Sequence, residues 1–414
     1  MNRNWKRAMA ALLVLVLVVP LCVSCGEEEE EGVVTITIGE MTDLTGPASP
    51  AIIPLHWALE DIVSYYNEEE LIPGVKFDMV SWDTRYEPAR DIPGYDWVRG
   101  HGAELIVAVP PPTGVALKTF ADRDEFPIVC LSTNVPMLEP PGWVFCMSNS
   151  HYSMMKTFLK WLSEEDPHFP TDRPAKIGLV GWSETATMED HKAIGEYCQD
   201  HSDEFVYAGH YIVPMGTMTW SGEVEKLKGC DYIEAKGFPT GGFINEFIDK
   251  GYRTNSEGFF DVGTASSYRG FLVDQCGWER LDGLLTPNMS LMWNEPTPLV
   301  ELAKELVYKY HPGKAEETIY AGLAYVGGIL ELVATFHILE QAIAEVGAEN
   351  FDGQAFYDAA IEYKTGGPLW EGYPEGWGFT ETKRYLADHI AIYEFNAEAE
   401  DLVWDGDWVP LVLE

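Results

Sequence analysis

The sequence predicts an α/β protein built from two doubly wound, mostly parallel sheets. Short apolar runs alternate with amphipathic helical segments in the first third of the chain, a pattern typical of a parallel sheet covered by helices. The same alternation then starts again over a stretch of similar size, so we expect a second unit of the same class. Because no low-complexity linker separates the units, we expect the chain to cross between them more than once.

The elements of the first unit follow from periodicity. "VVTITIG" alternates apolar and polar residues as a strand does, and "ALEDIVSYYNEE" has the apolar spacing of an amphipathic helix. The strand "VKFDMVSWD", the short helix in "PGYDWVRGHGA", the buried strand "ELIVAV", the helix "GVALKTFADRD" and the strand "FPIVCLS" complete the unit. Pro110–Pro112 form a stiff corner before that helix, because proline neither donates to a sheet nor continues a helix.

The second unit and the end of the chain follow in the same way. The second unit comprises "SMMKTFLKWLSEE", "KIGLVGW", "MEDHKAIGEYCQDH", "FVYAGHY", "SGEVEKLKG", "DYIEA", "GGFINEFIDKG", "GFFDV", a segment around "YRGFLVDQC" and "GLLTP", as alternating helices and strands. "PTPLVELAKELVYKYH" and the long "ETIYAGLAYVGGILELVATFHILEQAIAEVG" have helical periodicity. The strand "HIAIYEFN" precedes a predicted hairpin, "LVWDGDWVPLVLE", that turns at Asp405 and Gly406.

The charge of the chain excludes one class of partner. Its 414 residues include 67 acidic and 27 basic side chains, for a net charge of −40, and the acids are spread along the whole sequence. Such a chain is repelled by nucleic acid and by anionic lipid surfaces, so we expect no nucleic-acid partner. The even spread favours a solvated surface over an acidic tail that binds a basic partner.

The N-terminus has the pattern of an export signal. Three basic residues precede an uncharged apolar run, Ala8 to Leu21, which is short for a membrane span but suits a secretory signal. "VSCG", Val23 to Gly26, resembles a lipobox, the bacterial signal whose cysteine is lipidated. Residues 1–24 are therefore predicted to be a signal peptide, with lipidated Cys25 opening an acidic tether over residues 25–32. An uncleaved anchor is the alternative.

The other cysteines do not predict a metal site or a redox motif. After Cys25 these are Cys130, Cys146, Cys198, Cys230 and Cys276, and their odd number leaves at least one unpaired. Export permits disulfides, and Cys130 and Cys146, which flank one loop, are a possible pair. None of the five has the spacing of metal ligands, and no H-E-x-x-H, P-loop or G-x-S-x-G motif occurs. We therefore predict no metal, no cofactor and no catalytic residue.

Three segments carry a family resemblance. "ITIGEMTDLTGPAS", "SWDTRYEPAR" and "VPPPTGVALKTFADRDEFPIVCLSTNVP" together resemble type I periplasmic binding proteins of the branched-chain amino acid group, the solute receptors of ABC importers. In that family the first strand ends in a T-G-x-x loop, an asparagine like Asn67 precedes a glycine-containing turn, and an Asp-x-x-x-x-Pro segment, here Asp83 to Arg90, follows the second strand. The order of elements continues through Val412, so the resemblance covers essentially the whole mature chain.

The resemblance implies the type I periplasmic binding protein fold. This fold has two doubly wound parallel-sheet lobes joined by a three-strand hinge, with the ligand cleft between them. It would place residues 33–148 and 287–384 in the N-terminal lobe, and residues 149–286 and 385–414 in the C-terminal lobe. The late helices would then return to cover the first lobe.

Two corners of the first lobe are the predicted site for a ligand carboxylate. Ligands of open α/β sheets bind outside the carboxyl ends of the strands, where free backbone N–H groups and helix dipoles favour an anion. Here these corners are Pro110–Gly114 and Leu131–Asn134, and in the family the two loops grip the ligand carboxylate. The resemblance thus implies ligand contacts for Thr113, Gly114, Ser132, Thr133 and Asn134. Thr113 and Asn134 can also act as helix caps.

The second lobe departs from the family pattern. Thr185 stands where the family often has a tyrosine, Trp182 could supply a ring from nearby, and Phe238 stands at a second tyrosine position. Asp261 lies next to the position of the acid that pairs with the ammonium group of the ligand. These four residues are candidates for ligand contact, with core packing as the alternative for Trp182 and Phe238.

The predicted function is that of a substrate-binding lipoprotein of an ABC importer. It would capture a small carboxylate-bearing solute, either an amino acid or a related organic acid or amide, by hinge closure and deliver it to permease subunits. We expect a monomer that is exported to the periplasm or the cell surface and anchored by its lipid. The alternative is a ligand-sensing receptor of the same fold that acts through a signalling partner. A hydrolase is disfavoured, because no nucleophile or metal arrangement is recognisable.

Overall fold

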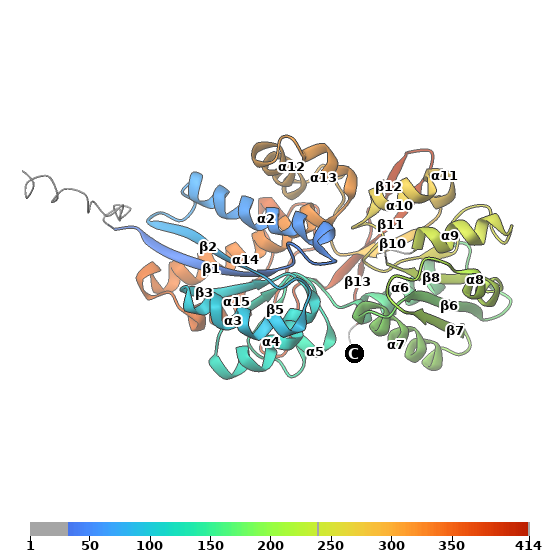
Figure 1. The fold of residues 1–414 in the computed structure, drawn as a ribbon, viewed down its shortest axis with the longest axis horizontal. Coiled ribbons are helices and arrows are strands. Elements are labelled where there is room, and N and C mark those ends of the chain that lie inside the picture. The colour runs from blue at the N-terminus through green and yellow to red at the C-terminus, as the bar shows by residue number, and fades with distance from the viewer. Residues whose placement is uncertain (1–31, 238–239, 413–414) are drawn as a thin grey trace, which may run out of the picture. The chain divides into compact units, whose positions relative to one another are not determined.

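The computed structural model describes residues 32–237 and 240–412, and the chain from Thr35 onward forms one compact unit. The predicted signal peptide, the lipidated Cys25 and the tether up to residue 31 lie outside the described residues, as does Phe238. Two sheets with helices on both faces make up the fold, so the predicted α/β class is confirmed (Figure 1).

The first sheet has five strands in the order β2-β1-β3-β4-β5. The pairs β1–β3, β3–β4 and β4–β5 are parallel, as predicted. The strands are β1 (Val34–Thr42), β2 (Val75–Asp83), β3 (Ala103–Ala108), β4 (Ile128–Cys130) and β5 (Val144–Cys146). The helices that alternate with them are α2 (Ser49–Glu68), α3 (Asp91–Gly100), α4 (Pro111–Asp124) and α5 (Val135–Leu138).

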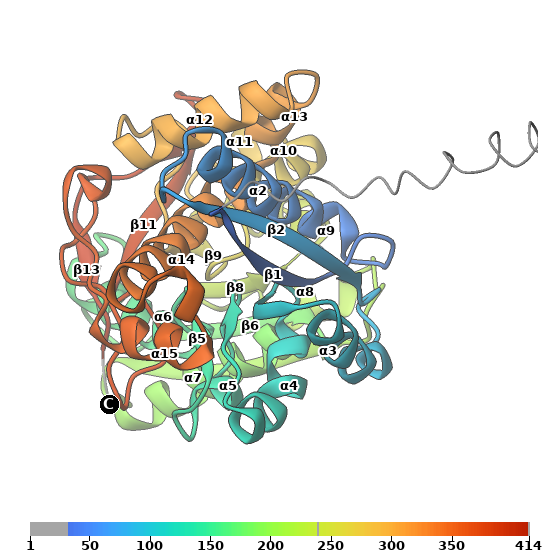
Figure 2. The same ribbon diagram turned by 90° about the vertical axis from the view of Figure 1, so that its left-hand side faces the viewer.

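Alternation along β1 divides the side chains of this sheet between two faces. Ile36 and Ile38 are fully buried in a core that also contains residues of α2 and of the late helix α14 (Ala324–Val346). Met41 is buried on the opposite face with residues of α3 and α4 (Figure 2). The period of two residues that identified the strand thus also decides which helices cover each face.

The second sheet has eight strands, and its main order is β12-β11-β10-β9-β8-β6-β7, with β13 also paired to β11. Neighbours from β7 to β10 are parallel, whereas β11 is antiparallel to β10, β12 and β13. The strands are β6 (Ala175–Trp182), β7 (Phe205–Val213), β8 (Tyr232–Lys236), β9 (Phe259–Phe260), β10 (Leu285–Asn288), β11 (His389–Asn396), β12 (Asp401–Val403) and β13 (Trp408–Pro410). The associated helices are α6 (His151–Glu165), α7 (Thr185–Asp200), α8 (Ser221–Leu227), α9 (Thr240–Asp249), α10 (Arg269–Cys276) and α11 (Trp278–Leu281).

The late helical block consists of α12 (Pro298–Tyr310), α13 (Ala315–Ala321), α14 and α15 (Gly353–Glu362). The sequence predicted one long helix where the structure has α13 and α14, and this prediction is wrong. Gly322 separates them with a φ of +133°, and a Cβ at this position would lie 2.3 Å from the carbonyl oxygen of Ser266. The chain therefore needs glycine to turn at this point, and helical periodicity alone does not reveal the turn.

One described helix, α14, is long and apolar enough to cross a membrane by length and composition. Its most apolar window is nevertheless 78% buried inside the protein. Its buried side chains share one core with residues of α2 and α15. These contacts identify α14 as a core helix.

The predicted hairpin at Asp405 and Gly406 is also wrong. Both β12 and β13 pair with the same partner, β11, so the chain reverses between Asn396 and Asp401 instead. Gly406 has a φ of +97°, and the N–H of Asp407 donates to Oδ1 of Asp405 at 3.1 Å. The Asp-Gly pair thus interrupts the antiparallel partner of β11 between β12 and β13. A tight local turn of this kind can form a bulge as well as a hairpin.

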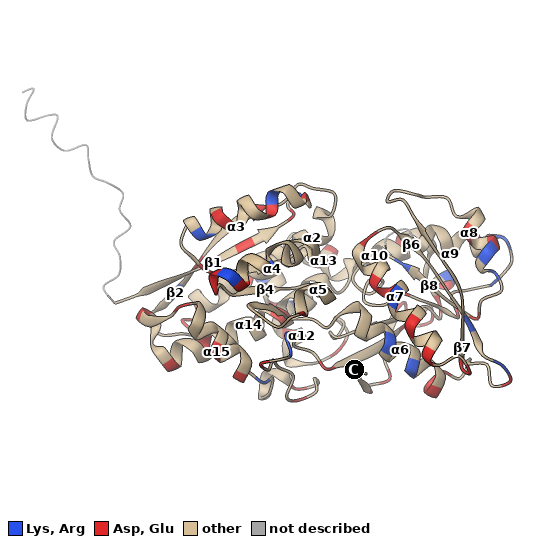
Figure 3. Ribbon diagram, turned by 90° about the horizontal axis from the view of Figure 1, so that it is seen from below, with Lys and Arg blue, Asp and Glu red and all other residues tan. Residues whose placement is uncertain are grey.

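The chain passes between the two sheets three times: after β5, after β10 and before β11. The third passage lies beside the end of β5, where the N–H of Cys146 donates to the carbonyl of Arg384 at 2.8 Å. The N–H of Leu386 donates back to the carbonyl of Cys146 at 2.9 Å. In the ribbon of Figure 3 the acidic residues, in red, are scattered over helices around both sheets.

Candidate functional site

The loops after the parallel strands of the two sheets face each other. The clearest contact between them joins α5 to α7, where the N–H of Val135 donates to Oε1 of Glu189 at 2.9 Å. Val135 follows the loop after β4, and Glu189 lies in the helix that follows β6. The carboxyl ends of the strands, where open α/β sheets bind ligands, therefore meet in one region of the molecule.

The proline corner is the first turn of α4. The sequence predicted a helix only from Gly114, but α4 begins at Pro111, since proline suits the first helical positions. The hydroxyl of Thr113 donates to Oδ1 of Asp91 at 2.9 Å, and Thr113 is only 1% exposed. A Cβ on Gly114 would lie 2.6 Å from Sγ of Cys130. Both residues therefore serve the packing of α4 against its neighbours.

The loop after β4 brings Ser132, Thr133 and Asn134 together. The hydroxyl of Thr133 donates to the carbonyl of Ser148 at 2.8 Å, so this side chain is engaged within the loop region. Among the described residues, the backbone N–H groups of these three residues have no hydrogen-bond acceptor, although Thr133 and Asn134 are 3% and 2% exposed. Buried amides are nearly always paired. Three successive amides without acceptors are suited to bind a carboxylate.

A second group of free amides lies at the start of α7. The residue before this helix, Glu184, makes no side-chain cap. Within the described part of the chain, the N–H groups of Thr185, Ala186 and Thr187 have no acceptor, whereas that of Met188 donates to the carbonyl of Glu184. The helix is sixteen residues long, so the positive end of its dipole is added to these donors.

Trp182 ends β6 and is half-buried. Its Nε1–H donates to the carbonyl of Thr217 at 2.9 Å, and its ring packs against the larger core. These contacts anchor the ring within its own lobe, beside the start of α7.

Asp261 is fully buried immediately after β9. Its Oδ1 lies 3.3 Å from Nζ of Lys236, and its Oδ2 accepts a hydrogen bond from the N–H of Gly237 at 3.2 Å. Burial raises the pKa of Asp261 to about 6. The acid that the sequence placed near the ammonium partner is therefore paired with a lysine of its own lobe.

Lys236 lies at the centre of a buried charge cluster. Its Nζ is 3.0 Å from Oδ2 of Asp190 and 3.8 Å from Oε1 of Glu234, in addition to Asp261. Burial opposes the charge of this ammonium group, but the three carboxylates outweigh burial and raise the pKa of Lys236 above its usual value. Nδ1 of His151 lies 3.2 Å from the same nitrogen. Burial and the neighbouring lysine lower the pKa of His151 to about 4, so this imidazole is neutral at physiological pH.

Cys130 and Cys146 are register partners on the parallel strands β4 and β5, and both are free thiols. The disulfide that the sequence suggested is therefore not formed. Each sulfur has its own place in the core: Sγ of Cys146 lies 3.9 Å from Sδ of Met137, and Sγ of Cys130 packs against Gly114. The two sulfurs therefore pack against α5 and α4 instead of bonding to each other.

Sequence reasoning missed Glu184, Glu189 and Lys236. A signal was present for Lys236, because it directly follows the predicted strand "DYIEA", and a charged residue at the end of a buried strand needs partners. Glu184 and Glu189 lie in polar helical sequence that resembles any solvated face. Burial raises the pKa of both carboxyl groups, that of Glu189 to about 7. Their surroundings depend on the loops of the other sheet, which the local sequence does not reveal.

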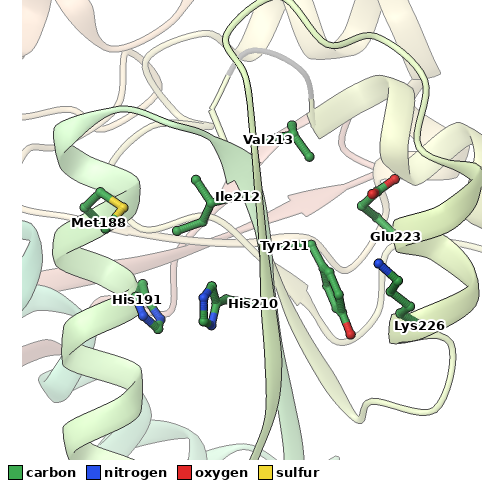
Figure 4. A pocket seen from close by; sticks show the side chains of 8 residues that line it. All are labelled: Met188, His191, His210, Tyr211, Ile212, Val213, Glu223 and Lys226. Carbon is green, nitrogen blue, oxygen red and sulfur yellow. The ribbon is translucent and has the colours of Figure 1, made fainter.

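A separate hollow lies along the free edge of β7, between α7 and α8 (Figure 4). Its volume is about 490 Å³, and none of the predicted site residues lines it. His191 and His210 point toward one another in it, with ring centroids 3.8 Å apart. The lining residues are Met188, His191, His210, Tyr211, Ile212, Val213, Glu223 and Lys226. No group of three or more His, Cys, Asp or Glu side chains that could hold a metal ion occurs among the residues that the structure describes.

Comparisons with known proteins identify relatives of this chain. A family model described as "Periplasmic binding protein" matches residues 35–399. A comparison with curated proteins finds no match.

Solved structures similar to this one cover 91% of its length. A branched-chain amino acid ABC transporter protein from Thermus thermophilus with bound valine is 18% identical, with a TM-score of 0.77 over 97% of that chain. A fatty acid ABC transporter substrate-binding protein from Thermomonospora curvata is 15% identical, with a TM-score of 0.74 over 93% of its chain. A possible leucine/isoleucine/valine-binding protein from Rhodopirellula baltica is 13% identical, with a TM-score of 0.71 over 98% of its chain. At these identities the likeness establishes the fold.

Proposed function

The chain belongs to the periplasmic binding protein family, and we propose that it is the substrate-binding protein of an ABC importer. In this proposal the protein is exported to the periplasm or the cell surface, and lipidated Cys25 anchors it to the membrane. Residues 33–148 and 287–384 form one lobe, and residues 149–286 and 385–414 form the other. The three passages of the chain between the sheets act as the hinge.

We propose a solute that carries a carboxylate, or an amide that presents the same acceptor oxygen. The observation that carries this proposal is the set of free backbone amides on both sides, at Ser132–Asn134 and at Thr185–Thr187. Hydrogen bonds to an ionised acceptor are about twice as strong as those between neutral groups. A carboxylate has two acceptor oxygens, so in this proposal it accepts from donors of both lobes. Two structural neighbours are named for valine and for fatty acid, which share a carboxylate, whereas only valine has an ammonium group.

Amine recognition through Asp261 is not part of this proposal. That carboxylate is paired with Lys236, and breaking this pair would leave a buried ammonium group with fewer partners. We therefore expect the carboxylate of the solute to contribute more to its binding than an amine does.

Closure requires no chemistry in this proposal. The solute contacts donors of both lobes only when the lobes are together, so it shifts a hinge equilibrium by its preference for the closed state. A shift from mostly open to mostly closed needs about 5 kcal/mol of preference. Several charge-assisted hydrogen bonds and the burial of an apolar group can supply this preference, and the closed form is then presented to the permease.

A thermal-shift screen tests the proposal. The purified mature protein is heated with amino acids, fatty acids and other carboxylates, each beside its methyl ester. A bound solute at 100 times its dissociation constant should add about 2.7 kcal/mol to the free energy of unfolding. We expect a carboxylate to raise the melting temperature and its methyl ester to lose most of this effect. A screen in which no small molecule raises the melting temperature would contradict the proposal.

A further inference from the structure

The contact between Glu189 and Val135 is a buried carboxyl group held between the two sets of loops. Glu189 lies on α7 and is 9% exposed, and its Oε1 accepts the N–H of the first residue of α5 at 2.9 Å. The two residues are 54 positions apart and follow strands of different sheets. This bond therefore depends on how close the loops of the two sheets lie to each other.

The surroundings of Glu189 compensate a negative charge only in part, and burial outweighs what they contribute. No ion pair to Glu189 occurs within the described ranges, 32–237 and 240–412. Two charged groups act on it: Asp190, which adjoins it in sequence and disfavours its charge, and Lys192, which favours it. The Lys192 side chain is 59% exposed, and its Nζ lies 3.9 Å from Oε1 of Glu196. The α5 side contributes the amide of Val135 and the side chain of Asn134, and neither is charged.

Two buried acceptor atoms are left without a donor at this contact. These atoms are Oε2 of Glu189 and Oδ1 of Asn134, neither of which has a hydrogen-bond partner among the described residues. A proton on Oε2 would remove the negative charge from this buried place, while Oε1 would still accept from the N–H of Val135. An ionised carboxylate would instead keep a charge in a buried place, with its Oε2 lacking a donor, which is costly.

We propose that Glu189 is the positioning residue that holds the loops of the two lobes together, and that it does so as a neutral carboxylic acid. Its consequence, that a proton assists closure of the cleft, rests on the proposed function. The contact itself can be tested without any solute.

The sign of the pH dependence follows from the contact. Burial raises the pKa of Glu189 from its usual 4.5 to about 7, although the hydrogen bonds from Val135 and Asn134 and the charge of Lys192 oppose this rise. When the lobes separate, the group is solvated and its ordinary pKa returns. The closed arrangement therefore binds the proton more tightly. It is favoured at low pH, and this stabilisation is lost as the pH rises through 7.

Small-angle X-ray scattering of the solute-free protein tests the inference. We expect the radius of gyration of the wild type to rise between pH 5.5 and pH 8.5. Glu189→Gln carries a permanent amide donor in place of the acid proton, so it should stay compact at both values. Glu189→Ala removes the contact and should give the larger radius at both. Asp200→Asn, which removes an exposed acid at the other end of α7, is the matched control and should behave like the wild type.

The comparison of the wild type with Glu189→Gln decides the question even if Glu189→Ala fails to fold. Repulsion among the many acids also grows with pH, but it acts equally in both proteins. A radius that rises equally in the wild type and in Glu189→Gln, or in neither, would overturn the inference. The proposed function is tested separately, because a failed solute screen leaves the scattering result unchanged.

Discussion

The ammonium group of Lys236 lies 3.0 Å from Oδ2 of Asp190, and neither side chain has any exposed surface. The same ammonium group is also the cation nearest to the buried carboxyl groups of Glu234 and Asp261. One lysine therefore compensates three acids directly beneath the loops that would bind a solute. Removal of one partner from a buried ion pair is costly because it leaves an uncompensated charge. Lys236 should accordingly contribute more to the free energy of unfolding than any single acid of the cluster.

Lys236→Met should strongly destabilise the protein. Methionine fills a similar volume but leaves three buried acids without a cation, so we expect a loss of about 3–5 kcal/mol in the free energy of unfolding. Urea unfolding followed by circular dichroism measures this loss. Lys192→Met removes a lysine of α7 whose side chain is 59% exposed, and it should change the same quantity by less than about 0.5 kcal/mol. Equal effects of the two variants would contradict this account of the cluster.

Asp261 should make the stability fall as the pH rises. Burial raises its pKa from 3.8 in the unfolded chain to about 6 in the folded protein. The folded state therefore binds the proton more tightly, so its stabilising contribution is complete below pH 4 and is lost as the pH rises through 6. At about 1.4 kcal/mol per unit of pKa, the loss is about 3 kcal/mol.

Asp261→Asn isolates this contribution. The amide does not titrate, so urea unfolding between pH 4 and pH 7.5 should show a smaller fall in stability than in the wild type. Burial also raises the pKa of Glu234, so part of the pH dependence of stability should remain in the variant. If the variant also binds the solute found by the thermal-shift screen as the wild type does, Asp261 is not its ammonium partner. An unchanged pH dependence of stability would contradict the assigned titration.

Most of the fold could be predicted because its elements have strong local patterns. The β1 strand alternates at a period of two and the buried β3 is a continuous apolar run, and both lie where the sequence placed them. Two of the errors in the predicted elements arose where a glycine has more than one local use. Gly322 breaks a helical pattern without a polar interruption, and Gly406 forms a bulge where an Asp-Gly pair most often signals a hairpin.

The candidate site was predictable as a set of loops but not as a set of side chains. The loops follow from strand order, which places the carboxyl ends of parallel strands at one edge. The partners of a polar side chain depend on residues distant in sequence. Thr113 meets Asp91, 22 positions away, and Val135 meets Glu189, 54 positions away. What remains for a ligand is mainly backbone N–H, a group that every residue other than proline carries and that sequence patterns do not single out.

Thr113→Val should reduce stability and leave solute affinity nearly unchanged. The hydroxyl of Thr113 is the donor to the buried Asp91, whose pKa burial already raises. Loss of this donor should cost about 1–3 kcal/mol in the free energy of unfolding. Thr185→Val, at an exposed position, serves as the stability control and should cost less than about 0.5 kcal/mol. A large loss of solute affinity at unchanged stability would instead assign the Thr113 hydroxyl to the solute.

Gly114→Ala tests whether this glycine serves the packing of α4. Its new Cβ would lie 2.6 Å from Sγ of Cys130 and 2.9 Å from both Sδ and Cε of Met137. The helix must then move away from β4 and α5, and such overpacking costs about 1–3 kcal/mol. Gly222→Ala is the matched control, because it lies in α8 and its Cβ would meet no atom within 4 Å. There alanine should stabilise the protein by about 0.4–1 kcal/mol. Urea unfolding of the two variants should therefore give shifts of opposite sign, and a neutral Gly114→Ala would show that α4 is not held by this close approach.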